Sequence, residues 1–195
     1  MEFAPAPDSP DLRSGEVHVW RATLETVPAD LTLRRVLALY LDEAAEEIEL
    51  AQGEHGKPHL AANPPPLSFN LSHSGDLALV ALARDREVGV DVERVKPERD
   101  LAAIAERALA PEDAAAVREA TEPERARLFY ELWTRHEARL KCLGIGLAAR
   151  PTWPAPPVAV QSLPIDPGFA AAVAMSGDAV PVRCWTFDQP RPFAG

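Results

Sequence analysis

The chain has 195 residues, of which 47% are hydrophobic and 26% are charged, an ordinary balance for one compact globular domain. This composition argues against disorder along the whole chain. Asp and Glu number 30 against 20 Lys and Arg, which gives a formal net charge of −10. General nucleic-acid binding and docking on an anionic membrane are therefore disfavoured, because both need a surplus of basic residues.

The first half of the chain predicts a helix among short strands. Three prolines in the first ten residues predict a flexible N-terminal tail over residues 1–14. Alternating apolar residues predict a strand over 16–24, and apolar residues at helical spacing predict a helix over 31–44. Further strands are predicted at 48–51, 67–72, 77–83 and 87–93.

From residue 100 the apolar spacing becomes helical. Pro111 suits the first position of a helix. A longer helix is predicted over 123–143, ending at Gly144, since glycine favours the position just after a helix. The final strands are predicted at 158–162, 169–175 and 181–187.

A faint internal repeat divides the chain into two parts. Glu16-Val-His-Val-Trp20 resembles Glu87-Val-Gly-Val-Asp91. We therefore predict an α+β fold of two similar halves with pseudo-twofold symmetry, each a small antiparallel sheet packed with helices. The N-terminal half is expected at 15–85 and the C-terminal half, with the candidate site described below, at 86–195.

The cysteines and the first residues bear on the compartment. Cys142 and Cys184 cannot make a disulfide framework, and neither has the spacing of a metal ligand. They are expected to be buried thiols in a reducing compartment. The N-terminus lacks the basic and apolar regions of a signal peptide, and no apolar stretch is long enough to span a bilayer. The sequence therefore predicts a cytoplasmic protein.

Two groups of residues in the second half are candidates for chemistry. Asp91 and Glu93 alternate on a predicted strand, so both carboxylates lie on one face and suit Mg²⁺. A solvated strand face is the alternative. Trp133, Glu137 and Lys141 are spaced by four residues and form one stripe of the long helix. An ordinary surface ion pair between Glu137 and Lys141 is the alternative. The adjacent stripe of Leu132, His136, Leu140 and Leu143 is predicted to face the core.

Two polar turns precede these groups. Gly56-Lys57-Pro58 is a stiff turn that carries one cation, a common arrangement with little specificity on its own. Phe69-Asn-Leu-Ser-His-Ser74 ends a strand with hydroxyls and an imidazole, which suit a phosphate. The alternative is a turn whose Ser and Asn side chains bond to their own backbone.

In chain order, four motifs resemble the 4′-phosphopantetheinyl transferase superfamily: Gly-Lys-Pro at 56–58, Phe-Asn-Leu-Ser-His-Ser at 69–74, Gly-Val-Asp-Val-Glu at 89–93 and Trp-Thr-Arg-His-Glu-Ala-Arg-Leu-Lys at 133–141. The length and the two similar halves resemble its Sfp-type branch. The resemblance implies an enzyme that moves the phosphopantetheine arm of coenzyme A to a serine of an apo acyl, peptidyl or aryl carrier protein and releases 3′,5′-ADP. No nucleophile is then expected in this chain.

The resemblance also implies a metal and a proton acceptor. Asp91, Glu93 and Glu137 would hold Mg²⁺, with Mn²⁺ as the alternative. Glu137 would take the proton from the carrier serine, directly or through water. Lys141 would pair with the α-phosphate and stabilise the departing nucleotide. Asp91, Glu137 and Lys141 are thus the expected catalytic residues.

Coenzyme A would be held by further residues of the same motifs. Lys57 and Pro58 would line the adenine and ribose end, and Ser72 and His73 would contact the phosphates, together with Lys141. Relatives of this type usually carry a basic helical stretch where this chain has only residues 25–30. The resemblance therefore predicts weaker discrimination between coenzyme A and its 3′-dephospho form.

The remaining expectations concern His136 and the partners. The family usually has Lys at the position of His136, and the histidine carries less charge at neutral pH. Carrier docking is predicted through Arg94, Lys96 and Arg99. A monomer is expected, with no nucleic-acid or membrane partner. The alternative function is a catalytically weakened module that binds coenzyme A or a carrier protein without transfer.

Overall fold

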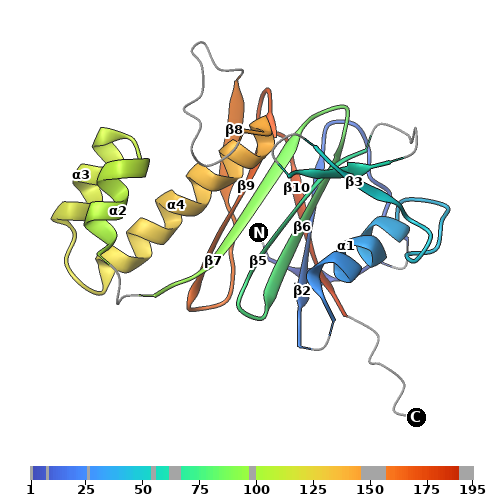
Figure 1. The fold of residues 1–195 in the computed structure, drawn as a ribbon, viewed down its shortest axis with the longest axis horizontal. Helices are drawn as coiled ribbons and strands as arrows, with labels where there is room; N and C mark the ends of the chain where they lie inside the picture. Colours follow the sequence, from blue (N-terminus) through green and yellow to red (C-terminus); the bar gives the residue numbers. More distant parts are fainter. Residues whose placement is uncertain are drawn as a thin grey trace.

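Two β-sheets lie side by side at the centre of the protein (Figure 1). The computed structural model describes residues 2–7, 9–25, 27–53, 56–61, 67–96, 100–145 and 157–188. The larger sheet has the order β1-β10-β2-β6-β5. These strands are, in that order, Ala4–Pro5, Val182–Phe187, Val17–Thr23, Leu77–Arg84 and Leu67–Ser74. β1, β10 and β2 pair in parallel, whereas β2, β6 and β5 pair antiparallel.

The smaller sheet is antiparallel and has the order β7-β9-β8. Its strands are, in that order, Val88–Arg94, Phe169–Ser176 and Val158–Ser162. β3 (Leu50–Gln52) and β4 (Pro58–Leu60) form a separate antiparallel pair. The helices of the described residues are α1 (Ala29–Ala38), α2 (Leu101–Ala108), α3 (Pro111–Glu119) and α4 (Glu124–Leu143). Figure 1 shows α2 and α3 at one end of the molecule and α1 with β3 at the other.

The two halves repeat one topology. Each half contains a strand, a helix and two further strands in the same chain order, with other elements between them. These are β2, α1, β5 and β6 in the first half and β7, α4, β8 and β9 in the second. In both sheets the third of these strands lies between the first and the second. The predicted α+β class is therefore confirmed. The pseudo-twofold relation and the boundaries at 15–85 and 86–195 stay predictions.

Most predicted elements appear close to their expected positions. The strands predicted at 158–162 and 169–175 are β8 and β9, and the long helix over 123–143 is α4. Gly144 follows α4 in the left-handed conformation, with φ of 66°, which glycine adopts without strain. Local sequence signals were thus sufficient for these elements.

Three segments differ from the sequence expectations. Residues 1–14 contribute β1 to the larger sheet and Leu12 to the hydrophobic core, although a flexible tail was expected. β10 lies in the C-terminal half of the chain but pairs with β2 of the N-terminal half. The helix expected to reach residue 44 ends at Ala38, and the hydroxyl of Tyr40 accepts a hydrogen bond from Trp20 Nε1 at 2.7 Å. The first two differences come from contacts between residues distant in sequence.

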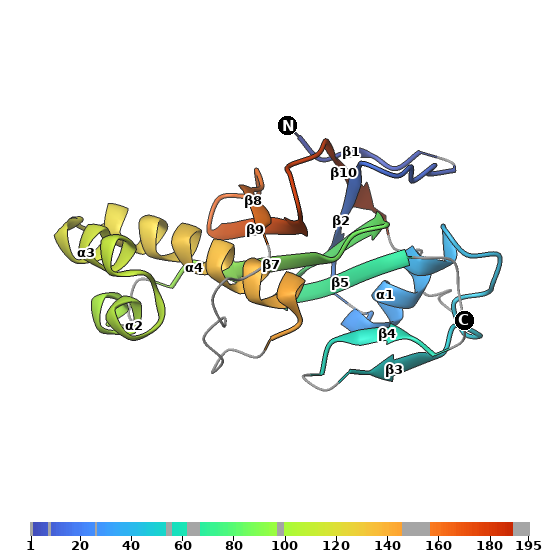
Figure 2. The same ribbon diagram turned by 90° about the horizontal axis from the view of Figure 1, so that it is seen from above.

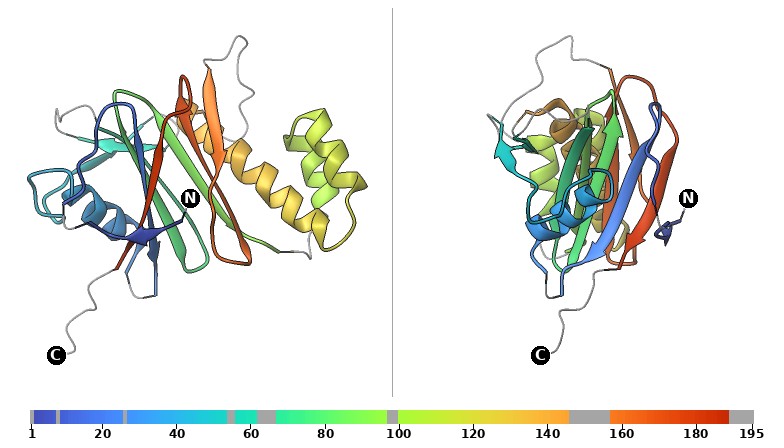
Figure 3. Two further views of the ribbon diagram at one scale, coloured as in Figure 1. Left: turned by 180° about the vertical axis from the view of Figure 1, so that it is seen from behind. Right: turned by 90° about the vertical axis from the view of Figure 1, so that its right-hand side faces the viewer.

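Apolar side chains cover both faces of the sheets. One cluster joins inward-facing residues of the two sheets, including Val19, Leu79, Val90 and Val173. On the other face, α1 packs over Trp20 and its neighbours, while α4 packs on the smaller sheet. Figure 2 shows α1, α4 and the β3–β4 pair on one side of the sheets and β1 on the other, and Figure 3 gives the views from behind and from one end.

The two sheets meet along a seam at which side chains of β5 form hydrogen bonds with β7. Backbone N–H groups of β7 donate to polar side chains of β5: Val90 to Asn70 Oδ1 at 2.8 Å, Val92 to Ser72 Oγ at 3.4 Å and Arg94 to Ser74 Oγ at 3.1 Å. These three side chains alternate along β5, so they share one face. The seam therefore brings Asn70, Ser72 and Ser74 directly beside the strand that carries Asp91 and Glu93.

Gly89 lets α4 approach β7 very closely. A Cβ at this position would lie 2.2 Å from the backbone oxygen of Ala138 and 2.3 Å from the backbone nitrogen of Cys142, both in α4. No side chain fits in that space. The missing side chain allows the helix residues Glu137 and Lys141 to reach the carboxylates of β7. Separately, no helix in the described ranges has the length and apolar character needed to cross a membrane.

Candidate active site

Asp91, Ser72 and Lys141 form a compact polar group at the middle of the seam. Lys141 Nζ lies 2.7 Å from Asp91 Oδ1 and donates to Ser72 Oγ at 2.9 Å. The Ser72 hydroxyl donates in turn to Asp91 Oδ1 at 2.9 Å. Asp91 is only 4% exposed, so its charge is compensated mainly by Lys141. The fold thus assembles three of the predicted residues from β5, β7 and α4.

Glu137 is a second buried carboxylate at the same place. It is 6% exposed, and its Oε1 atom and the Oδ2 atom of Asp91 are buried without a hydrogen-bond partner among the described residues. Burial, and after it the negative charges of Asp91 and Glu93, raise the pKa of Glu137 to about 7, against the lowering effect of Lys141. When Glu137 is deprotonated, Asp91 and Glu137 together therefore carry more negative charge than the ammonium of Lys141 compensates.

These two orphaned oxygens fit a hard divalent cation. Buried carboxylate oxygens without donors are the ligands that Mg²⁺ prefers, and a cation would supply the missing positive charge. Glu93 is placed differently, because its Oε2 atom accepts a hydrogen bond from Ser74 Oγ at 2.8 Å. In the part of the chain that the structure describes, no three His, Cys, Asp or Glu side chains gather as a ready metal site. The place of Glu93 among the ligands stays a prediction.

A small pocket of about 150 Å³ lies at the far end of the seam. Its lining includes Glu93, Lys96 and Trp133, and Trp133 stacks on Phe129 with ring centroids 5.6 Å apart. Arg94 also lines this pocket, but its guanidinium is committed elsewhere. It forms an ion pair with Asp76 at 2.5 Å and lies over the ring of Phe169. Of the cations predicted for carrier docking, Lys96 faces this pocket, and Arg99 lies outside the described residues.

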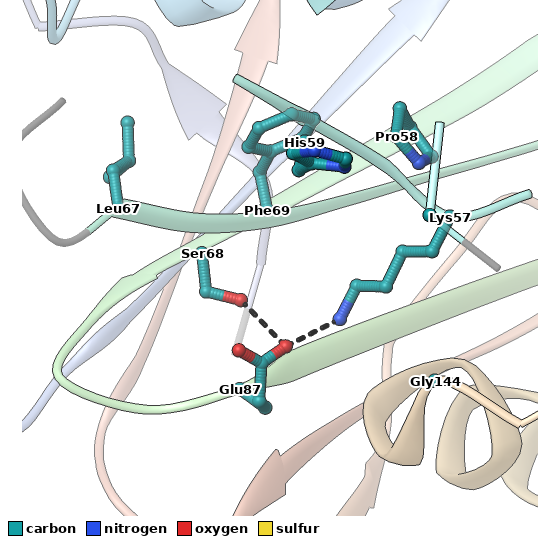
Figure 4. Close-up of a pocket in the computed structure, with 9 residues that line it drawn as sticks. Lys57, Pro58, His59, Leu67, Ser68, Phe69, Glu87 and Gly144 are labelled. Atoms are coloured by element: carbon teal, nitrogen blue, oxygen red, sulfur yellow. Dashed lines mark hydrogen bonds and ion pairs between the residues drawn. The ribbon is translucent and has the colours of Figure 1, made fainter. Parts of the chain in front are cut away.

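A larger pocket, of about 400 Å³, lies at the opposite end of the seam (Figure 4). Lys57 and Pro58 line it, so the Gly-Lys-Pro turn contributes to a cavity as expected. Lys57 Nζ pairs with Glu87 Oε2 at 2.7 Å and donates to the backbone oxygen of Val88 at 3.1 Å. Ser68 Oγ donates to the same carboxylate oxygen at 3.2 Å. Figure 4 shows Lys57, which immediately precedes β4, and Ser68 of β5 converging on Glu87.

Two predicted positions lie apart from the carboxylates. His73 is exposed, and the alternation of β5 places it on the face of Phe69, opposite to Ser72. His136 is half-buried beside Trp133. Burial and the positive charge of Arg139 lower the pKa of His136, with Asp113 opposing them, so the imidazole is neutral at pH 7.

Sequence reasoning missed four residues of the seam. Ser68, Asn70 and Ser74 fix β7 and its carboxylates, and Glu87 pairs with Lys57. The signal for the first three was a polar residue at every second position from 68 to 74, which marks one polar face of a strand. Glu87 had no comparable signal, because its partner Lys57 lies 30 positions away.

Comparisons with known proteins identify the family of this chain. A family model of the 4′-phosphopantetheinyl transferase superfamily matches residues 87–187, and a model of the 4′-phosphopantetheinyl transferase N-terminal region matches residues 19–85. The 4′-phosphopantetheinyl transferase HetI of Nostoc sp. is 28% identical, and the alignment covers 95% of this chain and 98% of HetI.

Other relatives match over a shorter length. The 4′-phosphopantetheinyl transferase AcpT of Salmonella typhi is 40% identical over 49% of this chain and 50% of its own length. A 4′-phosphopantetheinyl transferase of Bacillus subtilis is 29% identical over 63% of this chain and 53% of its own length. The matched region thus spans about half of these two relatives. Since the superfamily model alone covers more than half of the chain, the chain belongs to the 4′-phosphopantetheinyl transferase superfamily, a superfamily of transferase enzymes.

Proposed function

We propose that this protein transfers the phosphopantetheine arm of coenzyme A to a serine of an apo carrier protein and releases 3′,5′-ADP. The observation that carries the proposal is the pair of orphaned oxygens on Asp91 and Glu137 beside the ammonium of Lys141. Phosphoryl transfer between anions needs positioned positive charge and a proton acceptor, and this group offers both. Membership of the superfamily supports the same reaction class.

In the proposed reaction, the hydroxyl oxygen of the carrier serine attacks the phosphorus that bears the pantetheine arm. A new P–O bond forms, and the bond from that phosphorus to the bridging oxygen breaks, so 3′,5′-ADP leaves with the electron pair. The serine proton passes to the carboxylate of Glu137, directly or through water. Lys141 would stay near the leaving phosphate and stabilise its developing charge.

Asp91 and Glu137 would hold Mg²⁺, or Mn²⁺ in its place, with Glu93 as the third predicted ligand. When bound, the ion would neutralise the pyrophosphate and act as a Lewis acid. Ser72 holds Asp91 and Lys141 in fixed positions through its two hydrogen bonds. A preorganised site of this kind loses little free energy to reorganisation during the reaction.

The order of groups along the seam supports a placement for coenzyme A. Its nucleoside end would occupy the pocket of Lys57 and Pro58, and its pyrophosphate would lie at Ser72 and Lys141. Asp91 at the carboxylates lies four positions after Glu87 at the pocket, which is about 13 Å of extended chain. This spacing suits a nucleoside at one end and a pyrophosphate at the other. The predicted phosphate contact of His73 is retained as a proposal, and it would come from the face of β5 opposite to Ser72.

The partner proposals follow from charge. A carrier protein would dock beside Lys96 and the small pocket at the end of β7. Arg94 is paired with Asp76 and would contribute less to docking than the sequence suggested. We retain three predictions from the sequence: a monomeric state, a cytoplasmic location and the absence of nucleic-acid or membrane partners.

The test is intact-mass spectrometry of an apo carrier protein incubated with this protein, coenzyme A and Mg²⁺. We expect a gain of one phosphopantetheinyl group that disappears with EDTA. Glu137→Gln keeps the size of the side chain but cannot accept the serine proton, so the gain should vanish in this variant. Glu112→Gln, an exposed charge change on α3, should behave as the wild type.

The other outcome separates the two functions that the sequence left open. If several carrier proteins gain no mass while coenzyme A still binds in calorimetry, the chain is a binding module. Failure of both measurements would contradict the assignment of the nucleotide pocket as well.

A further inference from the structure

The cation of the large pocket is already neutralised within the protein. Lys57 Nζ lies 2.7 Å from Glu87 Oε2, and the Lys57 side chain is only 21% exposed. The same carboxylate oxygen accepts a hydrogen bond from Ser68 Oγ. A ligand entering this pocket therefore meets an ion pair, with little net charge, where a free lysine was expected.

The backbone of Glu87 is held from both sides. Its N–H donates to Ser176 Oγ at 3.0 Å, and its carbonyl accepts from the N–H of Ser176 at 2.9 Å. The thiol of Cys142, in α4, donates to the same carbonyl at 3.3 Å. These bonds fix the start of β7 against β9 and α4. The backbone of Glu87 is therefore held at the pocket, where its carboxylate contacts Lys57 and Ser68.

A second negative element lies in the pocket wall. Gly144 lines the pocket and follows the last residue of α4, a helix of 20 residues. The C-terminal end of a helix carries partial negative charge and disfavours anions close to it. Pro58, Leu67 and Phe69 supply the apolar part of the wall. This combination suits a flat, uncharged nucleoside better than one that carries a phosphate.

We infer that Glu87 is a specificity-determining residue that weakens the preference of this pocket for a 3′-phosphate on the ribose. It does so by occupying Lys57 and by adding its own negative charge beside the ligand. The protein is then expected to accept coenzyme A and its 3′-dephospho form to a similar degree. This inference rests on the proposed function, because it assumes that the nucleoside end of coenzyme A enters this pocket.

The experiment compares the binding of coenzyme A and of 3′-dephospho-coenzyme A by calorimetry. Three proteins are used: the wild type, Glu87→Gln and the control Glu112→Gln. Glutamine still accepts hydrogen bonds from Lys57 and Ser68, and Glu87 is largely exposed, so the fold is preserved. We expect the wild type to bind the two nucleotides within about threefold of each other.

In Glu87→Gln, coenzyme A is expected to bind about three- to tenfold more tightly, because one partly screened negative charge is removed near the phosphate. The 3′-dephospho form should bind as before, and the gain for coenzyme A should shrink in 0.5 M NaCl. The Glu112→Gln control should match the wild type with both nucleotides, since α3 lies at the opposite end of the molecule from β3 (Figure 1).

An unchanged ratio of the two affinities in Glu87→Gln would overturn the inference and leave the proposed function in place. An equal gain for both nucleotides would also overturn it, since the effect would not depend on the 3′-phosphate. If none of the three proteins binds either nucleotide, the proposed function fails and this inference fails with it.

Discussion

Replacing Glu137 with Gln is expected to stabilise the metal-free protein at alkaline pH. The pKa of Glu137 in the folded protein is raised to about 7, mainly by burial, from its ordinary value of 4.5. A group whose pKa is raised by folding favours the folded state while it is protonated, and this advantage is lost as the pH rises through the folded-state pKa. Glutamine has no proton to lose, so the variant escapes that loss.

The raised pKa sets the size of the effect. A difference of about two and a half pH units corresponds to about 3 kcal/mol of stability that the wild type loses in full above pH 7. At pH 5 the folded-state carboxyl is still protonated, and the loss is below about 1 kcal/mol. The variant should therefore exceed the wild type in unfolding free energy by about 2 kcal/mol more at pH 8 than at pH 5.

The assay is urea unfolding at pH 5 and pH 8 in EDTA, followed by tryptophan fluorescence. Glu112→Gln provides the control, because an exposed carboxylate should give the same small difference at both pH values. If the stability gain of Glu137→Gln is the same at pH 5 and pH 8, the carboxyl is not desolvated as the structure indicates. The same variant should be inactive in the transfer assay.

Further predictions concern the metal, the helix contact and His136. Mg²⁺ at 10 mM should raise the Tm of the wild type by about 3–6 °C at pH 8, and Asp91→Asn should remove most of that shift, because a buried ligand is lost. Gly89→Ala should destabilise the protein by about 3 kcal/mol in urea unfolding, since the new Cβ would overlap the backbone at Ala138 and Cys142. His136→Lys should lower the KM for coenzyme A about two- to fivefold at pH 7.5 in the transfer assay, because a neutral imidazole is replaced by a cation.

Each of these predictions has a result that would contradict it. An equal Mg²⁺ shift in the wild type and in Asp91→Asn would remove Asp91 from the ligands, and the same measurement on Glu93→Gln tests the third predicted ligand. Gly53→Ala is the matched control for Gly89→Ala, because its Cβ would meet only one atom, at 3.3 Å. An unchanged KM in His136→Lys would show that position 136 does not act on the bound nucleotide.

Local patterns predicted most elements of this fold. Short apolar runs over residues 77–83 and 169–175 predicted β6 and β9, and Gly144 predicted the end of α4. These signals depend on periodicity and on backbone preferences, which a few neighbouring residues determine. The order of the four motifs likewise indicated the family before any geometry was known.

The orientation of α4 could not be predicted from its pattern. The stripe of Leu132, His136, Leu140 and Leu143 was expected to face the core, but only Leu140 of these four is buried. The buried face instead includes Glu137. Apolar periodicity assumes that hydrophobic residues are the ones buried, and this assumption fails where a helix places charged groups against a strand to build a site.

The sequence by itself determined the α+β class, the alternation that aligns Asp91 with Glu93, and the family to which the chain belongs. Only the tertiary structure decided that Glu137 and Lys141 reach Asp91, since this depends on the close approach of α4 at Gly89. The tertiary structure also decided that Glu87 neutralises Lys57 and that β10 joins the sheet of the first half. These outcomes depend on contacts between residues 30 to more than 160 positions apart, which no local preference encodes.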